Sequence, residues 1–264
     1  MTSLFHEMYE SLCPVWSDSN QSIGRSINMG WGRIFGGQLL GQALATAQSY
    51  PERMGKVHSM HAHFLDVGKV DTNVSYRLFS MRKGRTYWTC RVEGYQEERY
   101  LFHAVFSFQQ PEEGLSHQVS MPEVPAPEGL DSYQVTLRRM VESFPAERRN
   151  RISSVWIERL YRTAPIEVRP IQPKNFLMPD NREGRRLLWF RSAERLPDDS
   201  DVHERVLAWV SDFPMLGTSL QPHGIFPSSP KIKMASLDHT IWFYAPFRAD
   251  EWMLCDVQSP RSDA

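Results

Sequence analysis

Hydrophobic and polar residues alternate along residues 57–110 with the two-residue period of a β-strand. Polar turns around Lys83-Gly84 and Glu97-Glu98-Arg99 interrupt this alternation. Aromatic and β-branched residues are enriched between the turns, as is typical of antiparallel strands that bury one face. The pattern predicts an antiparallel meander of four strands with the sequences VHSMHAHFL, VSYRLFSM, TYWTCRVEGY and YLFHAVFSF.

Residues 34–48, IFGGQLLGQALATAQ, carry an apolar residue at every fourth position and are predicted to form a helix. Small residues are unusually frequent in it, and each glycine costs a helix about 1 kcal/mol relative to alanine. Close approach of a sheet wrapped around the helix would offset this cost. A phosphate-binding role for Gly36-Gly37 is the alternative, although no strand–GxxxxGK pattern surrounds them. A sheet curled about one central helix is the hotdog arrangement.

A change of composition separates this unit from a second one. Residues 111–163 are first rich in proline and then in charge, which predicts a linker with helical segments interrupted by Pro145. The strands and the helix predicted after it are IEVRP, LLWFRSA, HERVLAWVSDFPMLGTSL (mostly helical, broken near Pro214), MASLDHTIWFYAPF and EWMLCDV. The predicted fold is therefore an α+β tandem double hotdog, with units at residues 1–110 and 164–264.

The two units are related by an internal repeat. Residues 236–243 align with residues 58–65, each being the first strand after a helix, with His239 opposite His61. Carried forward without gaps, the alignment sets Ala264 opposite Thr86, whereas the first unit continues through residues 87–110 as two more strands. We therefore expect an apparently C-terminally truncated second unit that lacks its last two strands and has an exposed sheet edge.

Composition excludes several classes of protein. The chain has 264 residues, 41% hydrophobic and 23% charged, with a net charge of −1, which argues against a nucleic-acid partner. No apolar run is long enough for a membrane span, and the acidic first residues do not form a secretory signal. Three widely spaced cysteines, Cys13, Cys90 and Cys255, indicate a reducing compartment without a disulfide framework.

Three histidines of the first predicted strand are candidates for chemistry. His61 and His63 lie two residues apart, hence on one strand face, which would suit two metal ligands. No third ligand stands at a recognisable spacing, so a pair of partly buried, hydrogen-bonded histidines is the alternative, and we expect no metal. His58 lies on the opposite face and is the candidate substrate-binding residue.

Asp212 is the more informative candidate. It follows the apolar run 206–210, where an ionised carboxylate is costly without partners. The alternative is that Asp212 only caps the segment after the bend. Ser236, in the strand after that helix, is the nearest hydroxyl that chain order could bring back to Asp212, although it could equally be an ordinary strand serine. Asp238 could share a face with Ser236 or form an ion pair with His239.

The chain as a whole resembles the type II acyl-CoA thioesterases, the double-hotdog family that includes bacterial thioesterase II and the peroxisomal acyl-CoA thioesterase. The resemblance spans residues 33–260, in family order, and rests on the stretches RIFGGQLLGQALATAQ, VHSMHAHFL, KGRTYWTCRV, HAVFSFQ, SDFPMLGTSLQPHG and SLDHTIWFYAPFRADEWMLCDVQSP.

The resemblance implies hydrolysis of fatty acyl-CoA to free fatty acid and CoA without a metal or organic cofactor. The family's catalytic Asp falls on Asp212 and its Ser/Thr on Ser236, and together with a Gln they hold and polarise a water molecule. The Gln belongs to a final strand that this chain does not contain. The implied location is the cytoplasm or the peroxisomal matrix, and homo-oligomerisation is left open. The alternatives are an impaired double-hotdog protein that binds acyl-CoA or a partner chain without hydrolysis, and, less favoured, a hotdog hydratase or dehydratase.

Overall fold

The computed structural model describes residues 3–29, 32–149, 164–172, 183–213, 215–225 and 232–263. The elements of the N-terminal part are α1 (Leu4–Ser11), β1 (Val15–Trp16), β2 (Gln21–Gly24), α2 (Gly36–Gln48), β3 (Lys56–Phe64), β4 (Val74–Lys83), β5 (Tyr87–Gln96) and β6 (Arg99–Gln109). Those that follow are η1 (Pro127–Gly129), α3 (Tyr133–Glu142), α4 (Ala146–Arg149), β7 (Ile166–Pro170), β8 (Arg185–Ser192), α7 (Ser200–Ser211), α8 (Met215–Leu220), η2 (Gln221–His223), β9 (Asp238–Trp242) and β10 (Met253–Gln258).

The larger sheet has seven antiparallel strands in the order β1-β2-β4-β5-β6-β3-β9. The four predicted strands are confirmed, but they do not form a simple meander, because β3 pairs with β6 and not with β4. Of these four strands, β4, β5 and β6 are neighbours in chain order. The sequence patterns did not predict α1, β1 and β2, which are short and add an edge to β4.

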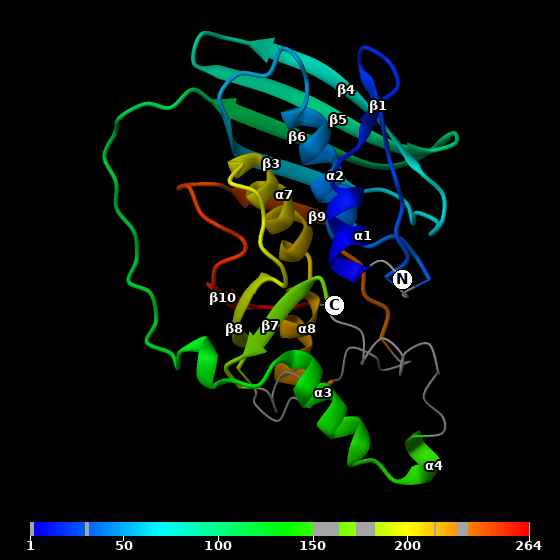
Figure 1. Ribbon diagram of the computed structural model, residues 1–264, viewed down its shortest axis with the longest axis vertical. Helices are drawn as coiled ribbons and strands as arrows, with labels where there is room; N and C mark the ends of the chain where they lie inside the picture. The colour runs from blue at the N-terminus through cyan, green and yellow to red at the C-terminus, as the bar shows by residue number, and fades with distance from the viewer. Residues whose placement is uncertain are drawn as a thin grey trace.

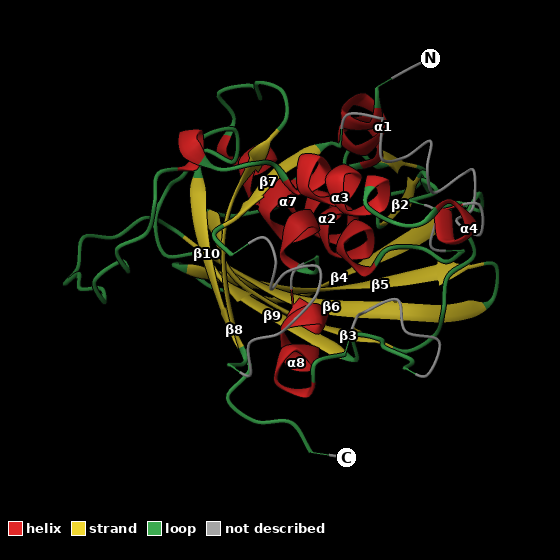
Figure 2. Cartoon of the chain, turned by 90° about the horizontal axis from the view of Figure 1, so that it is seen from below, coloured by secondary structure: helices red, strands yellow, loops and turns green. Residues whose placement is uncertain are grey.

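The predicted central helix is confirmed as α2, which lies against one face of this sheet (Figures 1 and 2). Twelve of its thirteen residues, from Gly37 to Gln48, are buried. It shares one apolar core with the inward side chains of the sheet, among them Tyr76 of β4, Trp88 of β5 and Phe102 of β6, none of which is exposed to solvent. This burial is the main source of the attachment of helix to sheet.

Gly37 and Gly41 of α2 face a second helix and not the sheet. An added Cβ at Gly37 would collide with the carbonyl oxygen of Trp209 in α7, and one at Gly41 would lie 3.2 Å from the carbonyl oxygen of Arg205. We expected close approach of a wrapped sheet to offset the cost of the glycines, and this is wrong. The close approach is that of α7. Because later positions of α2 meet earlier positions of α7, the two helices run antiparallel.

The second part of the chain divides its strands between two sheets. A smaller antiparallel sheet has the order β10-β8-β7, and its apolar face packs with α7 around Leu188, Phe190 and Val206. β9 joins the larger sheet instead, pairing with β3 so that His239 lies opposite Ala62. In the internal repeat, β9 corresponds to β3 and β10 corresponds to β4. In the larger sheet β5 and β6 lie between β4 and β3, whereas no described strand lies between β10 and β9. The prediction of a smaller second sheet is confirmed.

The connecting segment, described up to residue 149, is helical only in places there. Residues 110–126 carry no regular structure, and α3 and α4 are separated at Pro145 as the sequence predicts. The predicted break in the later helix is confirmed by the separation of α7 from α8, while Pro214 itself lies outside the described residues.

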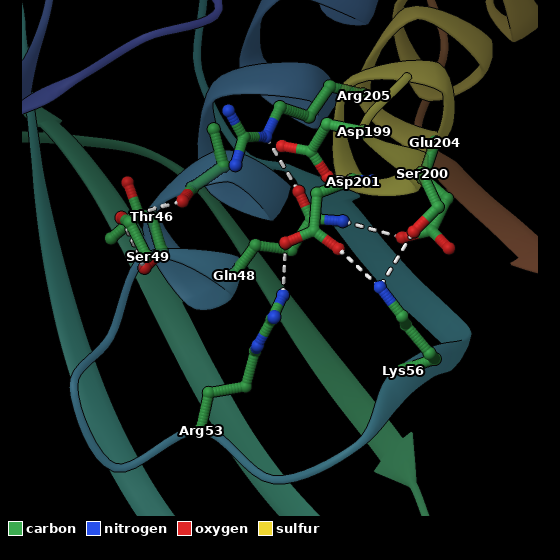
Figure 3. Close-up of polar contacts among 11 residues, drawn as sticks. Thr46, Gln48, Ser49, Arg53, Lys56, Asp199, Ser200, Asp201, Glu204 and Arg205 are labelled. Atoms are coloured by element: carbon green, nitrogen blue, oxygen red, sulfur yellow. Dashed lines mark hydrogen bonds and ion pairs between the residues drawn. The ribbon is translucent and has the colours of Figure 1, made fainter. Parts of the chain in front are cut away.

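A polar network joins the C-terminal end of α2 to the N-terminal end of α7 (Figure 3). The amide Nε2 of Gln48 donates to Oε2 of Glu204 at 2.6 Å, and its Oε1 accepts from Nε of Arg205 at 2.7 Å. Arg53 forms an ion pair with Asp201. Burial raises the pKa of Glu204 to about 7, with the nearby charge of Asp201 adding to the effect. The carboxyl group of Glu204 is therefore partly protonated near neutral pH.

Gly37→Ala tests the contact between the two helices. The added methyl group has no room beside the Trp209 carbonyl, so we expect the free energy of unfolding to fall by about 1–3 kcal/mol. Urea unfolding followed by circular dichroism measures the change. Gly114→Ala is the matched control, because nothing lies within 4 Å of that position, and it should change stability by less than about 0.5 kcal/mol. Equal stability of the two variants would contradict the close contact.

Glu204→Gln tests the buried carboxyl group. Because its pKa in the folded protein lies above the ordinary 4.5, its stabilising contribution is present at acid pH and is lost as pH rises toward about 7. The glutamine of the variant cannot ionise. The free energy of unfolding of the variant, relative to that of the wild type, should therefore increase by roughly 1–3 kcal/mol from pH 5 to pH 8. Urea unfolding at several pH values, with the exposed Glu123→Gln as control, measures this difference. A gap that stays constant with pH would refute the assignment.

Candidate active site

Asp212 brings the end of α7 to the beginning of α2. It occupies the C-cap position of α7, and only 8% of its surface is exposed. The hydroxyl of Ser236 donates a hydrogen bond to its Oδ1 at 2.7 Å, and the backbone N–H of Gly37 also donates to the carboxylate. The structure thus brings together the two residues that the sequence analysis paired, and adds a helix N-terminus to them.

The antiparallel arrangement of α2 and α7 explains this geometry. Phe35, the N-cap residue of α2, provides no side-chain hydrogen bond to the free N–H groups of the first turn. The carboxylate of Asp212 takes that role from the neighbouring helix, where the positive end of the α2 dipole favours an anion. An added Cβ at Gly36 would lie 2.5 Å from its Oδ2. The position considered for a phosphate at Gly36-Gly37 is therefore filled by the protein's own carboxylate.

Burial raises the pKa of Asp212 above its usual value of 3.8. Four groups oppose this effect by favouring the ionised form, and they are the Ser236 hydroxyl, His239, the Gly37 N–H and the charge of Arg33. Desolvation is the largest contribution, so the carboxylate retains more affinity for a proton than an ordinary aspartate. A buried carboxylate with a raised pKa and few direct donors is suited to accept a proton.

Ser236 is held in place by the segment around it. The backbone N–H of Phe64, at the end of β3, donates to the carbonyl of Leu237 at 2.9 Å, and Nη2 of Arg33 donates to the carbonyl of Met234 at 2.9 Å. Ser236 precedes β9, so the strand alternation that would put it on one face with Asp238 does not apply. Asp238 lies on the exposed face of β9, away from the pair.

His239 is a member of the site that the sequence analysis did not assign. It is half-buried on β9, and its Nε2 lies 2.9 Å from the hydroxyl oxygen of Ser211, the residue before Asp212. Burial lowers its pKa, and the charges of Asp212 and Asp238 oppose that effect. The available signal was its adjacency to Asp238 in the stretch SLDH, which pointed to an ion pair instead.

His58 lies away from these residues. It sits at an irregularity of the β3–β6 pairing, with its ring against Tyr87 at a centroid distance of 5.8 Å. It lies six positions before Phe64, the residue of β3 beside the site, which corresponds to about 20 Å along a strand. The structure therefore does not bring His58 to Asp212, and its role in substrate binding stays a prediction.

His61 and His63 lie on the exposed face of β3, on the other side of the sheet from the site. His61 packs edge-on against Trp242 of β9, and the ring of His63 stacks on His103 of β6 at 5.1 Å. Among the described residues no group of three or more His, Cys, Asp or Glu side chains could hold a metal ion. The two histidines are thus accounted for by contacts with neighbouring aromatic rings.

Similarity to known structures defines the class of this fold. The acyl-CoA thioesterase II TesB2 of Mycobacterium marinum superposes with a TM-score of 0.75 at 29% identity, covering 97% of this chain and 87% of the other. A hot dog fold protein of Alicyclobacillus acidocaldarius superposes with a TM-score of 0.73 at 17% identity, covering 98% and 88%. With two central helices and antiparallel sheets around them, the chain is a double-hotdog protein whose second unit has the smaller sheet.

Sequence similarity then identifies the family. Residues 161–264 match the family model described as acyl-CoA thioesterase, and residues 26–109 match the acyl-CoA thioesterase N-terminal domain. Acyl-coenzyme A thioesterase 8 of Mus musculus is 35% identical over 235 residues, 86% of this chain and 71% of the relative. Acyl-CoA thioesterase 2 of Haemophilus influenzae is 31% identical, covering 89% and 80%. The chain belongs to the acyl-CoA thioesterase family.

None of the helices in the described ranges has the length and apolar character needed to cross a membrane.

Asp212→Asn tests the burial of this carboxyl group through stability. Because its pKa is raised in the folded protein, its stabilising contribution is present at acid pH and falls as pH rises through that pKa. An asparagine does not ionise, so the variant should become increasingly more stable than the wild type between about pH 4 and 8. Thermal unfolding across that range measures the effect, with the exposed Glu123→Gln as control. If the stability of the wild type increased relative to that of the variant as the pH rises, the raised pKa of Asp212 would be contradicted.

Proposed function

We propose that this protein hydrolyses acyl-CoA thioesters, with fatty acyl-CoA as substrate and free fatty acid and CoA as products. Membership of the acyl-CoA thioesterase family supports the reaction class. The observation that carries the assignment to particular residues is the 2.7 Å hydrogen bond from Ser236 to Asp212, made beside the N-terminus of α2. The pairing joins a proton acceptor and a hydroxyl at a helix end that favours negative charge.

In the proposed mechanism Asp212 is the general base. It takes a proton from a water molecule as the water oxygen attacks the thioester carbonyl carbon, and Ser236 orients that water. The tetrahedral intermediate then collapses, the C–S bond breaks, and the proton held by Asp212 passes to the departing CoA sulfur. A positioned base of this kind typically contributes about 10²–10⁴-fold in rate. The family's third residue, a Gln, is assigned to no position of this chain, and the mechanism uses none.

The remaining parts of the proposal concern organisation. We place the protein in the cytoplasm or the peroxisomal matrix, a location supported by three free cysteines, which suit a reducing compartment. We also divide the chain into a first unit at residues 1–110, a connecting segment at 111–163 and a second unit at 164–264. Self-association stays a prediction, and sedimentation velocity would decide it.

Release of CoA tests the proposed activity. Purified protein is incubated with palmitoyl-CoA and a thiol-trapping dye, beside Asp212→Asn and Ser236→Ala. We expect kcat to fall by about 10²–10⁴-fold in Asp212→Asn, because the general base is lost. For Ser236→Ala we expect a fall of about 10–10²-fold, because the water loses one orienting group while the base remains.

Glu123→Gln is the control, since that exposed residue of the connecting segment lies outside the site and should keep full activity. Equal rates of CoA release from the wild type and Asp212→Asn would remove Asp212 from the mechanism. The alternative, a protein that binds acyl-CoA without hydrolysis, predicts saturable binding by calorimetry with no release of CoA from the wild type.

A further inference from the structure

The end of α7 is held by two neighbouring contacts from one short segment. Ser236 bonds to Asp212, and His239 bonds to Ser211 at 2.9 Å, so consecutive residues of the helix end meet residues 236–239. The segment is itself fixed to the larger sheet, because β9 pairs with β3 from Ser59 to His63. His239 is therefore part of the connection between the sheet and the carboxylate.

The alternation of β9 determines which charged groups His239 meets. His239 and Ile241 are half-buried on the inner face, whereas Asp238, Thr240 and Trp242 are exposed. On the neighbouring strand β3, the position paired with His239 is Ala62, and His61 and His63 lie on the exposed face of that strand. The charges that act on the imidazole are those of Asp212, from α7, and Asp238, from its own strand. Arg33 acts in turn on Asp212.

We propose that His239 is a positioning residue for Asp212, one that anchors the end of α7 through Ser211 and keeps the carboxylate ionised as the pH falls. This proposal rests on the proposed function, because it concerns the state of the general base. His239 is assigned no contact with the substrate. Its effect on catalysis passes through the position and the charge of Asp212.

The direction of the effect follows from the coupling of the two groups. His239 lowers the pKa of Asp212, and Asp212 raises the pKa of His239, while burial acts on each in the opposite direction. As the pH falls, a proton taken up by the imidazole creates a positive charge that favours the neighbouring carboxylate. Without the imidazole the next proton goes to Asp212. Loss of His239 should therefore inactivate the enzyme at a higher pH than in the wild type.

The pH profile of kcat/KM for palmitoyl-CoA hydrolysis tests the charge. In His239→Gln, whose amide can still bond to Ser211, the acid limb should move to higher pH by about 0.5–1 unit, with the alkaline plateau largely kept. His63→Gln is the matched control, because that residue lies on the other face of the sheet, and its profile should superpose on that of the wild type. Superposition of the His239→Gln profile on the wild type would overturn the proposal.

Ser211→Ala tests the anchor separately. It retains the imidazole but removes its hydrogen-bond partner, so kcat should fall about five-fold, the equivalent of one hydrogen bond, with KM unchanged. An unchanged kcat would remove Ser211 from the argument.

A measurement on the titration itself needs neither activity nor a His239 variant. The ring resonances of His239 are followed with pH by NMR in the wild type and in Asp212→Asn. We expect the pKa of His239 to be lower in the variant, because the negative charge beside it is gone, and an equal pKa would overturn the coupling. If the wild type releases no CoA, the proposed function fails while this titration still decides the coupling.

Discussion

The close approach of α2 and α7 is the contact on which the other features of the structure depend. Glycine at positions 37 and 41 lets the backbone of one helix come against the carbonyl groups of the other. Each glycine lowers the intrinsic stability of α2 by about 1 kcal/mol. In return the helices pack closely enough for α2 to contact one sheet and for α7 to contact the other. Without that approach, Gln48 would not reach Glu204 at one end of the helix pair, and the Gly37 N–H would not reach Asp212 at the other.

The antiparallel direction of the pair places a buried acid with a raised pKa at each end. Asp212 lies at the N-terminus of α2, where the helix dipole favours its charge, and Glu204 lies with Gln48 at the opposite end. Burial raises the pKa of both, so both reduce stability when they are ionised. At the Glu204 end, Arg53 and Lys56 pair with the neighbouring Asp201. At the Asp212 end, His239 and Arg33 favour the charged form, but desolvation remains the largest effect and the pKa stays raised.

Much of the fold could be predicted because its signals are local and strong. The alternation over residues 57–110 and the helical period over 34–48 are long, and burial of one strand face gives the alternation. The N-terminal elements were missed because their attachment is not local. Gln42 in α2 donates to the carbonyls of Ser11 and Arg25 and accepts from the hydroxyl of Tyr76, and no pattern along the sequence indicates such partners.

The candidate site was predictable only in part. Resemblance to a family paired Asp212 with Ser236, whereas periodicity alone left each of them with an ordinary alternative. The surroundings of Gly36-Gly37 were not predicted, because we expected a sheet to approach the glycines. The structure instead places the Asp212 carboxylate and the Trp209 carbonyl there. His239 could not be assigned because its partner, Ser211, lies in another element.

The pairing of β9 with β3 has a consequence for the order in which the protein matures. The strands β4, β5 and β6 can associate early, since they are neighbours along the chain. The site around Asp212, the proposed general base, instead needs the start of α2 to meet the end of α7 and the segment before β9. These groups lie far apart in sequence, so their encounter carries a larger loop-closure cost. Under the proposed mechanism, a nascent chain in which only β4, β5 and β6 have associated lacks the assembled site. Thioester cleavage then begins only after the long-range contacts of α2, α7 and β9 have formed.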